Sequence, residues 1–173
     1  MKASRLLASF QILNTIDMAS IYFAYGSNMN FTQMCSRCPG SEFVSVAHLK
    51  GWSYFINGNG YAGIEEQEDA ITHGCLWRLN EEHLRSLDHY EAVRAGYYSR
   101  VQMIVIKGLE LVEQEAEIYI SNNRTYGVPR KSYQMGIIQG ASELGLPKGH
   151  IEFLKSWEDG NPHTRKSDCQ NET

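Results

Sequence analysis

Residues 21–28 read IYFAYGSN, and this stretch is the clearest indication of local structure in the chain. The β-branched and aromatic run from Ile21 to Tyr25 predicts a strand, which Gly26 stops. Asn28 or Asn30 can cap the helix that follows, and Pro39 ends that helix. A strand therefore leads through a glycine turn directly into a helix.

The turn is itself a candidate binding site. A glycine lets the backbone approach a ligand closely, and the N–H groups that open a helix bind anions or an oxyanion. Ser27 and Asn28 add side-chain hydrogen-bond donors. Many ordinary turns have the same composition, so the turn alone does not establish a site.

Beyond this segment, hydrophobic alternation and turn residues predict further strands. They cover residues 44–48, 52–56, 74–79, 97–107 and 115–121, with Gly51 and the turn at 57–60 as boundaries. Helices are predicted from the Asn80 cap through Leu87, over 133–144, and after Pro147. Because turns rather than helices separate most strands, we expect an α+β single domain. Its mixed or antiparallel sheet is expected to curl into a small barrel flanked by helices.

The composition excludes several classes of protein. The chain has 173 residues, of which 42% are hydrophobic and 21% charged, as in an ordinary globular domain. No apolar run approaches the roughly 20 residues that cross a bilayer, so no membrane segment is expected. The net charge is −4 and no basic block is present, which argues against a nucleic-acid partner.

The two ends of the chain are expected to lie outside the folded domain. Residues 1–17 are basic and apolar, with no acid before Asp17. They are typical either of an organelle-targeting segment or of a start assigned upstream of Met18, and we favour the second, with a cytoplasmic location and poor packing of this segment. The folded domain is predicted over residues 20–158, and residues 159–173 are predicted to form a polar tail.

The four cysteines predict neither a disulfide scaffold nor a metal site. Cys35 and Cys38 form a CxxC pair, whereas Cys75 and Cys169 stand alone. A structural zinc site usually needs a second pair of ligands, which the sequence lacks. We therefore expect inert thiols on a helix rather than redox or metal chemistry.

Glu91 is the second place that carries chemistry. At 3.6 residues per turn it projects within roughly 20° of Leu84, at the end of an apolar stripe. A carboxylate there must be paired, have a raised pKa, or face a cleft. Asp88 lies about 40° to the other side of Leu84, so geometry does not choose between the two acids. A structural pairing of Glu91 with a backbone N–H or with Arg94 is the alternative.

Taken together, the two places resemble one family. YFAYGSN resembles the opening signature of the γ-glutamylcyclotransferases, and residues 87–98, LDHYEAVRAGYY, resemble their LDxxEGxxxGxY segment. The RxP motif at Arg37, the strand residues Ala62-Gly63-Ile64 with Gly74, and Gly145-Leu146-Pro147 also fit. The resemblance spans residues 21–157. Two departures are Ala92, where the family commonly has glycine, and Arg124, where some members have an aromatic residue.

The resemblance implies a chemistry and a set of site residues. The α-amine of a γ-glutamyl amide attacks its own γ-carbonyl, which gives 5-oxoproline and releases the attached amine or amino acid. It implies Glu91 as the catalytic acid and base, with no metal, nucleotide or redox cofactor. Burial that raises the pKa of one carboxylate suits both proton transfers. The implied substrate-binding residues are Tyr22, Phe23, Ala24, Tyr25, Gly26, Ser27, Asn28, Tyr98 and Tyr133.

Several alternatives stay open at this point. A Ser27 nucleophile would need a histidine base, and no triad context is visible. The same cyclisation could remove a γ-glutamyl protecting group from a secondary metabolite, with Arg124 favouring an anionic or bulkier leaving portion. A non-catalytic relative that uses the pocket for binding is a further alternative, disfavoured because Glu91 is retained. The partner is a small γ-glutamyl molecule, and a homodimer is plausible.

Overall fold

The strand predicted from IYFAYGSN closes a barrel in the computed structural model, which describes residues 19–108 and 111–162. This strand is β1 (Ser20–Ala24), and it pairs antiparallel with β3 (Ala62–Leu79), from Ser20 opposite Leu79 to Ala24 opposite Cys75. The other edge of β1 pairs in parallel with β5 (Val112–Ser121) at Tyr22. A single short strand thus joins the two edges of the sheet.

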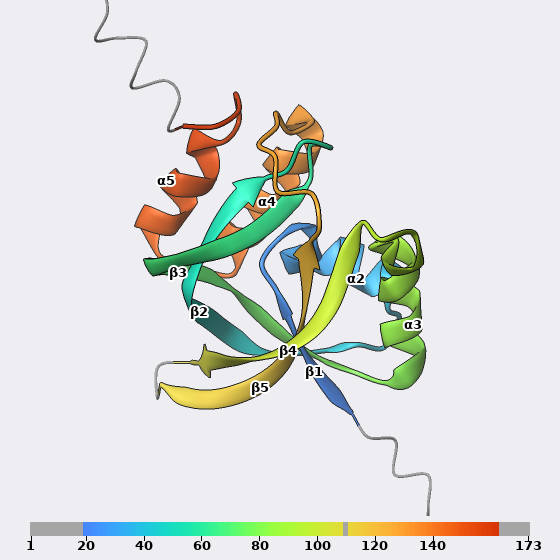
Figure 1. Cartoon of the computed structure of the whole chain (residues 1–173). Helices are drawn as coiled ribbons and strands as arrows, with labels where there is room; N and C mark the ends of the chain where they lie inside the picture. Colours follow the sequence, from blue (N-terminus) through green and yellow to red (C-terminus); the bar gives the residue numbers. More distant parts are fainter. Residues whose placement is uncertain (1–18, 109–110, 163–173) are drawn as a thin grey trace, which may run out of the picture.

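The remaining strands are β2 (Glu42–Ile56) and β4 (Tyr98–Lys107), and the order around the closed barrel is β1-β3-β2-β4-β5. All pairs are antiparallel except that of β1 with β5. The predicted α+β class, with a mixed sheet curled into a barrel, is confirmed (Figure 1).

Two strand boundaries differ from the prediction. Residues 44–48 and 52–56 belong to one strand, because Gly51 adopts φ +77° at a bulge without ending the pairing with β3. The strand predicted over 74–79 begins at Ala62 instead. Its middle, residues 66–69, is polar and exposed, so it lacks the hydrophobic alternation that indicates a strand.

The helices begin where their capping residues predict. In α2 (Phe31–Arg37) the Asn30 side chain accepts the Gln33 N–H at 3.0 Å, so Asn30 rather than Asn28 is the cap. Asn80 caps α3 (Glu81–Tyr90), and Pro147 precedes α5 (Lys148–Ser156). The other helical segments are α4 (Lys131–Glu143) and the 3-10 turns η1 (Ser27–Met29) and η2 (Val93–Ala95).

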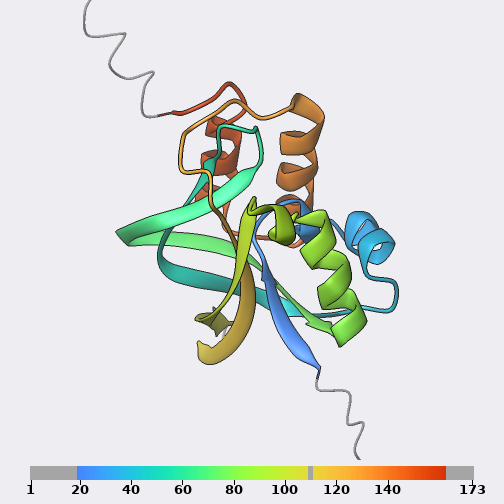
Figure 2. The ribbon, with the colours of Figure 1, turned by 45° about the vertical axis from the view of Figure 1, so that its right-hand side comes forward.

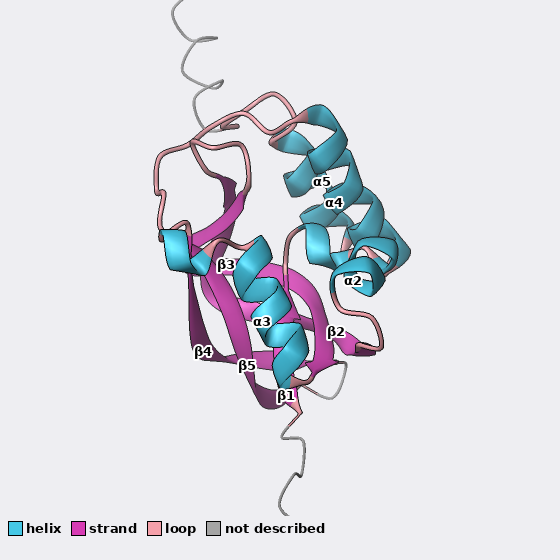
Figure 3. Ribbon diagram, turned by 90° about the vertical axis from the view of Figure 1, so that its right-hand side faces the viewer, coloured by secondary structure: helices cyan, strands magenta, loops and turns pink. Residues whose placement is uncertain are grey.

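The helices gather in two groups on the barrel. α4 and α5 lie side by side near β2 and β3, whereas α2 and α3 lie on the other side (Figure 1). Figure 2 shows α3 running along the barrel wall beside β1, and Figure 3 shows α2 and α4 approaching each other above it. Buried side chains from the strands and the helices form one hydrophobic core. Its fully buried members include Phe23, Phe55, Ile64, Leu76, Trp77, Leu87 and Trp157.

The predicted terminal segments lie largely outside the described residues. This applies to residues 1–17 and to residues 163–173 of the tail. Among the residues that the structure describes, no helix has the length and apolar character that crossing a membrane requires.

Three histidines meet between the barrel and α5. His48 on β2 lies opposite His73 on β3, with ring centroids 5.6 Å apart, and the His150 ring of α5 lies 5.1 Å from that of His73. His150 is buried, and its Nε2 has no hydrogen-bond partner among the described residues. Burial first, and His73 second, lower the pKa of His150 to about 4.

We expect this trio to make stability depend on pH. As pH falls below 6.5, the unfolded chain binds a proton at His150 that the folded chain does not bind until about pH 4. The free energy of unfolding therefore falls in that window, by roughly 3 kcal/mol at its lower end. In urea unfolding experiments between pH 4 and 6.5, the free energy of unfolding of His150→Gln should change less with pH than that of the wild type. Equal slopes for the two proteins would contradict this reading.

Candidate active site

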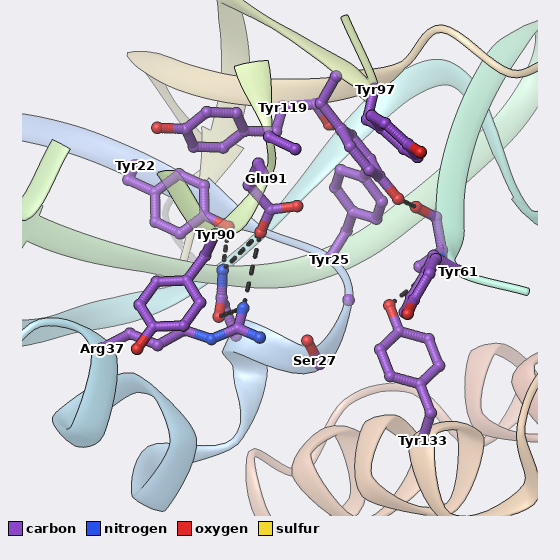
Figure 4. A pocket seen from close by; sticks show the side chains of 15 residues that line it. Tyr22, Tyr25, Ser27, Arg37, Tyr61, Tyr90, Glu91, Tyr97, Tyr119 and Tyr133 are labelled. Atoms are coloured by element: carbon purple, nitrogen blue, oxygen red, sulfur yellow. Dashed lines mark hydrogen bonds and ion pairs between the residues drawn. The ribbon is translucent and has the colours of Figure 1, made fainter. Parts of the chain in front are cut away.

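A cavity of about 360 Å³ opens where β1, the 3-10 turn η1 and the last residues of α2 and α3 meet (Figure 4). The starts of β3 and β4, together with single residues of β5 and α4, complete its wall. It is lined by Tyr22, Tyr25, Gly26, Ser27, Asn28, Arg37, Tyr61, Ala62, Tyr90, Glu91, Ala92, Tyr97, Tyr98, Tyr119 and Tyr133.

Most of the predicted site residues meet at this cavity. Glu91, Tyr98 and Tyr133 line it, as do five of the seven residues of YFAYGSN. Phe23 and Ala24 do not line it, because both are completely buried in the core. Neighbouring positions of a strand point to opposite sides, which turns Phe23 away from Tyr22 and the cavity. A substrate-binding role for Phe23 and Ala24 therefore has no support from the cavity wall and stays a prediction.

Glu91 is the acid that faces the cavity. It caps the C-terminus of α3, and its side chain is 18% exposed. Its Oε1 lies 3.4 Å from Asn28 Nδ2, which donates to it, and 3.7 Å from Arg37 Nη1. Burial raises the pKa of Glu91, while Arg37 and the Asn28 hydrogen bond oppose that rise. The partner is thus Arg37, and Arg94 does not appear among the contacts of this carboxylate.

Asp88, the other acid that the helical projection allowed, has a different environment. Its Oδ1 accepts a hydrogen bond from the Tyr119 hydroxyl at 2.8 Å, and its Oδ2 lies 3.3 Å from Arg100 Nη1. Its side chain is 31% exposed and lies outside the cavity wall. The structure therefore separates the two candidates, with Asp88 in a structural ion pair.

Asn28 holds the glycine turn and the acid together. It is 3% exposed, and its Nδ2 donates to the Tyr22 hydroxyl at 2.9 Å as well as to Glu91. Its Oδ1 accepts from Arg37 Nη1 at 2.9 Å, and its backbone carbonyl accepts from Trp77 Nε1 at 3.1 Å. Because every polar atom of the side chain is engaged, Asn28 fixes where the carboxylate of Glu91 points.

The turn brings backbone close to the cavity. A Cβ built on Gly26 would lie 3.2 Å from the Ala62 Cβ and 3.9 Å from the Tyr133 hydroxyl. The first N–H groups of η1 have no intrahelical acceptor. Ser27 Oγ accepts from Gln33 Nε2 at 2.6 Å, and no histidine is among the described residues that line the cavity. The base that a Ser27 nucleophile needs is thus missing from its surroundings.

Two tyrosine hydroxyls bind the backbone of the same residue, Ala62. The Tyr98 hydroxyl donates to the Ala62 carbonyl at 2.6 Å, and the Tyr133 hydroxyl accepts from the Ala62 N–H at 3.1 Å. Burial raises the pKa of both, that of Tyr133 to about 12, so both stay protonated near neutral pH. The Tyr98 proton is committed to Ala62, whereas Tyr133 keeps a proton with which it can donate to a ligand.

Several lining residues were not predicted as site residues. They are Arg37, Tyr61, Ala62, Tyr90, Ala92, Tyr97 and Tyr119. Arg37 had a signal in the RxP motif, but its return from the end of α2 to Asn28 depends on tertiary packing. Ala92 had a signal too. It adopts φ +49°, a left-handed conformation that glycine occupies more readily, which explains the family preference for glycine there.

Two other features named from the sequence lie away from the cavity wall. The Arg124 guanidinium donates to the Ile64 carbonyl at 2.8 Å, so a direct contact with a ligand in this cavity has no support. Cys35 on α2 is exposed and Cys38 is buried, both as free thiols, and burial raises the pKa of Cys38 to about 11. A thiol of that pKa is a poor nucleophile. Within the described ranges, no group of three or more His, Cys, Asp or Glu is placed to hold a metal ion.

The chain is similar in sequence and in structure to known proteins. The model of the AIG2-like family matches residues 72–154. The gamma-glutamylcyclotransferase of Homo sapiens is 30% identical over 156 residues, which cover 84% of this chain and 82% of that protein. The gamma-glutamylcyclotransferase of Mus musculus is 30% identical over 148 residues, covering 80% and 78%. A solved gamma-glutamyl cyclotransferase structure superposes with a TM-score of 0.76 at 30% identity, covering 82% of this chain and 89% of that one.

Proposed function

Because the chain belongs to the gamma-glutamylcyclotransferase family, we propose that it cyclises a γ-glutamyl amide to 5-oxoproline and releases the attached amine or amino acid. The environment of Glu91 supports this proposal. Glu91 is the one acid among the described residues of the cavity wall, and it is largely buried beside the Gly26 turn, with its pKa raised by burial. A carboxylate in that state can take up and return a proton near neutral pH.

The reaction needs two proton transfers around one ring closure. Glu91 removes a proton from the substrate ammonium, and the freed amine attacks the γ-carbonyl carbon of the same molecule. The tetrahedral intermediate then expels the leaving nitrogen, which takes this proton from Glu91. The ring nitrogen gives up a second proton, which makes the released amine an ammonium and leaves one hydrogen on the ring nitrogen of 5-oxoproline. Because both reacting groups belong to one molecule, the main task of the cavity is to hold a bent glutamyl chain in a near-attack conformation.

Groups beside Glu91 suit the two negative charges of such a substrate. One is the oxyanion of the intermediate and the other is the α-carboxylate. The first N–H groups of η1, which have no acceptor within that turn, and the Tyr133 hydroxyl are hydrogen-bond donors suited to these charges. Asn28 and Arg37 are engaged with Glu91 and with each other, which supports a role in positioning the base.

The proposal is tested by product analysis with the wild-type protein. Incubation with γ-glutamyl-alanine should release 5-oxoproline and alanine in equal amounts, quantified by chromatography and mass spectrometry. Release of glutamate with alanine would instead indicate hydrolysis. Absence of any release by folded protein, across γ-glutamyl amino acids and amines, would favour a binding protein.

The pH profile should reveal how Arg37 acts. Since Arg37 lowers the pKa of Glu91, replacing it by methionine removes that effect and the pKa rises further. Glu91 must be ionised to act as a base, so the acidic limb of the kcat/KM profile is expected to move to higher pH. At a pH on that limb, R37M should lose roughly tenfold in kcat/KM beyond any loss at the plateau.

R37K is the matched control, because it keeps the charge. Its acidic limb should stay closer to that of the wild type, even if loss of the Asn28 hydrogen bond lowers the plateau. A limb that is unmoved in R37M, with only a higher KM, would show that Arg37 binds substrate and does not tune the base.

A further inference from the structure

The cavity is lined by an unusual share of the aromatic residues of this chain. Of the ten tyrosines in the sequence, all within the described residues, eight line it. Seven of them fall into two groups by exposure, and Tyr133 is partly buried between these extremes. Tyr22, Tyr25, Tyr98 and Tyr119 are buried at 9% exposure or less, whereas Tyr61, Tyr90 and Tyr97 are 39%, 53% and 52% exposed. The last three, called the rim tyrosines below, surround the mouth.

The rim tyrosines come from three separate segments. Tyr61 ends the turn between β2 and β3, Tyr90 is the last residue of α3, and Tyr97 precedes β4. Figure 4 shows Tyr90 on one side of Glu91 and Tyr61 and Tyr97 on the other. The leaving portion of a substrate whose γ-carbonyl lies at Glu91 must therefore pass between these rings.

Two of the rings are held in place by their neighbours. The Tyr61 ring packs edge-on against that of Tyr133, with centroids 5.4 Å apart and planes at 86°. The Arg37 guanidinium lies over the Tyr90 ring, 4.7 Å from its centroid, in a cation–π contact. A rim of oriented rings offers stacking and edge contacts to another aromatic group.

The charges near the rim do not suit a carboxylate. Among the described residues that line the cavity, only Glu91 and Arg37 carry a formal charge. Arg37 is already engaged by Asn28, Glu91 and the Tyr90 ring. Arg94 lines a separate hollow that meets the cavity at Ala92, and Arg124 is bonded to the Ile64 carbonyl. A free carboxylate on the leaving portion would thus lie between tyrosine rings without a cation of its own.

We infer that the preferred substrates are γ-glutamyl amides of arylalkylamines, which carry an aromatic ring and no carboxylate on the leaving portion, and that the rim tyrosines bind this ring. The inference rests on the proposed cyclotransferase function and names its substrate class. The C–N bond of the new ring forms as the amide C–N bond breaks. Of the three ammonium protons, one stays on the ring nitrogen and two pass to the leaving amine, so no water or co-reactant is consumed.

Four substrates test the inference by separating the ring from the carboxylate. They are the γ-glutamyl amides of 2-phenylethylamine, phenylalanine, ethylamine and alanine, assayed for 5-oxoproline with the full chain. The phenylethylamine derivative should exceed both the phenylalanine and the ethylamine derivatives by about tenfold or more in kcat/KM. Equal or faster turnover of the alanine or phenylalanine derivative would overturn the inference and leave the cyclotransferase function intact. No release from any of the four would overturn both.

Variants of the rim give a second readout, the ratio of kcat/KM between the phenylethylamine and ethylamine derivatives. Tyr61→Ala and Tyr97→Ala should each lower this ratio by roughly fivefold. Tyr126→Ala is the control, because Tyr126 is 46% exposed but lies outside the cavity wall, and its ratio should match the wild type. A ratio unmoved in both rim variants would overturn the role given to the rim.

Discussion

We expect Glu91→Gln to lower kcat for 5-oxoproline release by about a thousandfold or more while the protein stays folded. Glutamine keeps the shape and can still accept from Asn28 Nδ2, but it cannot take the proton of the substrate ammonium. The substitution also removes a charge that is largely buried, so the free energy of unfolding should change little. The measurements are initial rates and urea unfolding of the two proteins side by side.

Asp88→Asn is the matched control for this variant. It makes the same chemical change three residues earlier, and asparagine can still accept from the Tyr119 hydroxyl. Loss of the pair with Arg100 should cost about 1 kcal/mol of stability or less, because both side chains are about one-third exposed. Activity should remain within a few-fold of the wild type. An Asp88→Asn loss as large as that of Glu91→Gln would contradict the assignment of the base.

The second large effect is on stability, from Gly74→Ala. A Cβ at Gly74 would lie well inside contact distance of the Ala24 carbonyl oxygen, and 3.0 Å from both the Ala24 carbonyl carbon and a ring carbon of Phe23. Backbone at the end of β1 cannot yield without disturbing the pairing that closes the barrel. We expect a loss of about 4 kcal/mol or more, a large part of the stability of a typical domain.

Gly136→Ala offers the same chemical change where space is open. Gly136 lies inside α4, and a Cβ there meets no atom within 4 Å among the described residues. Alanine in a helix interior should stabilise by about 0.5–1 kcal/mol. In thermal and urea unfolding, Gly74→Ala should therefore lower the stability of the protein and Gly136→Ala should raise it. A Gly74→Ala protein as stable as the wild type would show that β1 and β3 are not packed as described.

The sequence predicted the parts of the fold that depend on local pattern. The β1–Gly26–α2 segment, the Asn80 cap and the final helix after Pro147 were predictable because strand composition, capping and proline each act within a few residues. The length of β3 was not, since its polar and exposed middle has no hydrophobic alternation that would indicate a strand.

The candidate site was predictable to the same extent. Glu91 and the Gly26 turn carry recognisable motifs, so both could be named. The helical projection alone left both Glu91 and Asp88 open, because the contacts of Asp88 with Tyr119 and Arg100 involve other elements. Arg37 reaches Asn28 only because α2 folds back over η1, and the rim tyrosines meet only once the barrel closes. Contacts of that kind depend on tertiary structure rather than on local periodicity.

Product mass in water labelled with heavy oxygen distinguishes attack by the substrate amine from attack by water and tests Glu91 as the base. Intramolecular attack by the substrate amine, with Glu91 as the base, predicts unlabelled 5-oxoproline from the wild type and almost none from Glu91→Gln. Glutamate carrying the label would show that water attacks the γ-carbonyl, and undiminished 5-oxoproline from Glu91→Gln would show that another group is the base. Either result would contradict the mechanism proposed for this cavity.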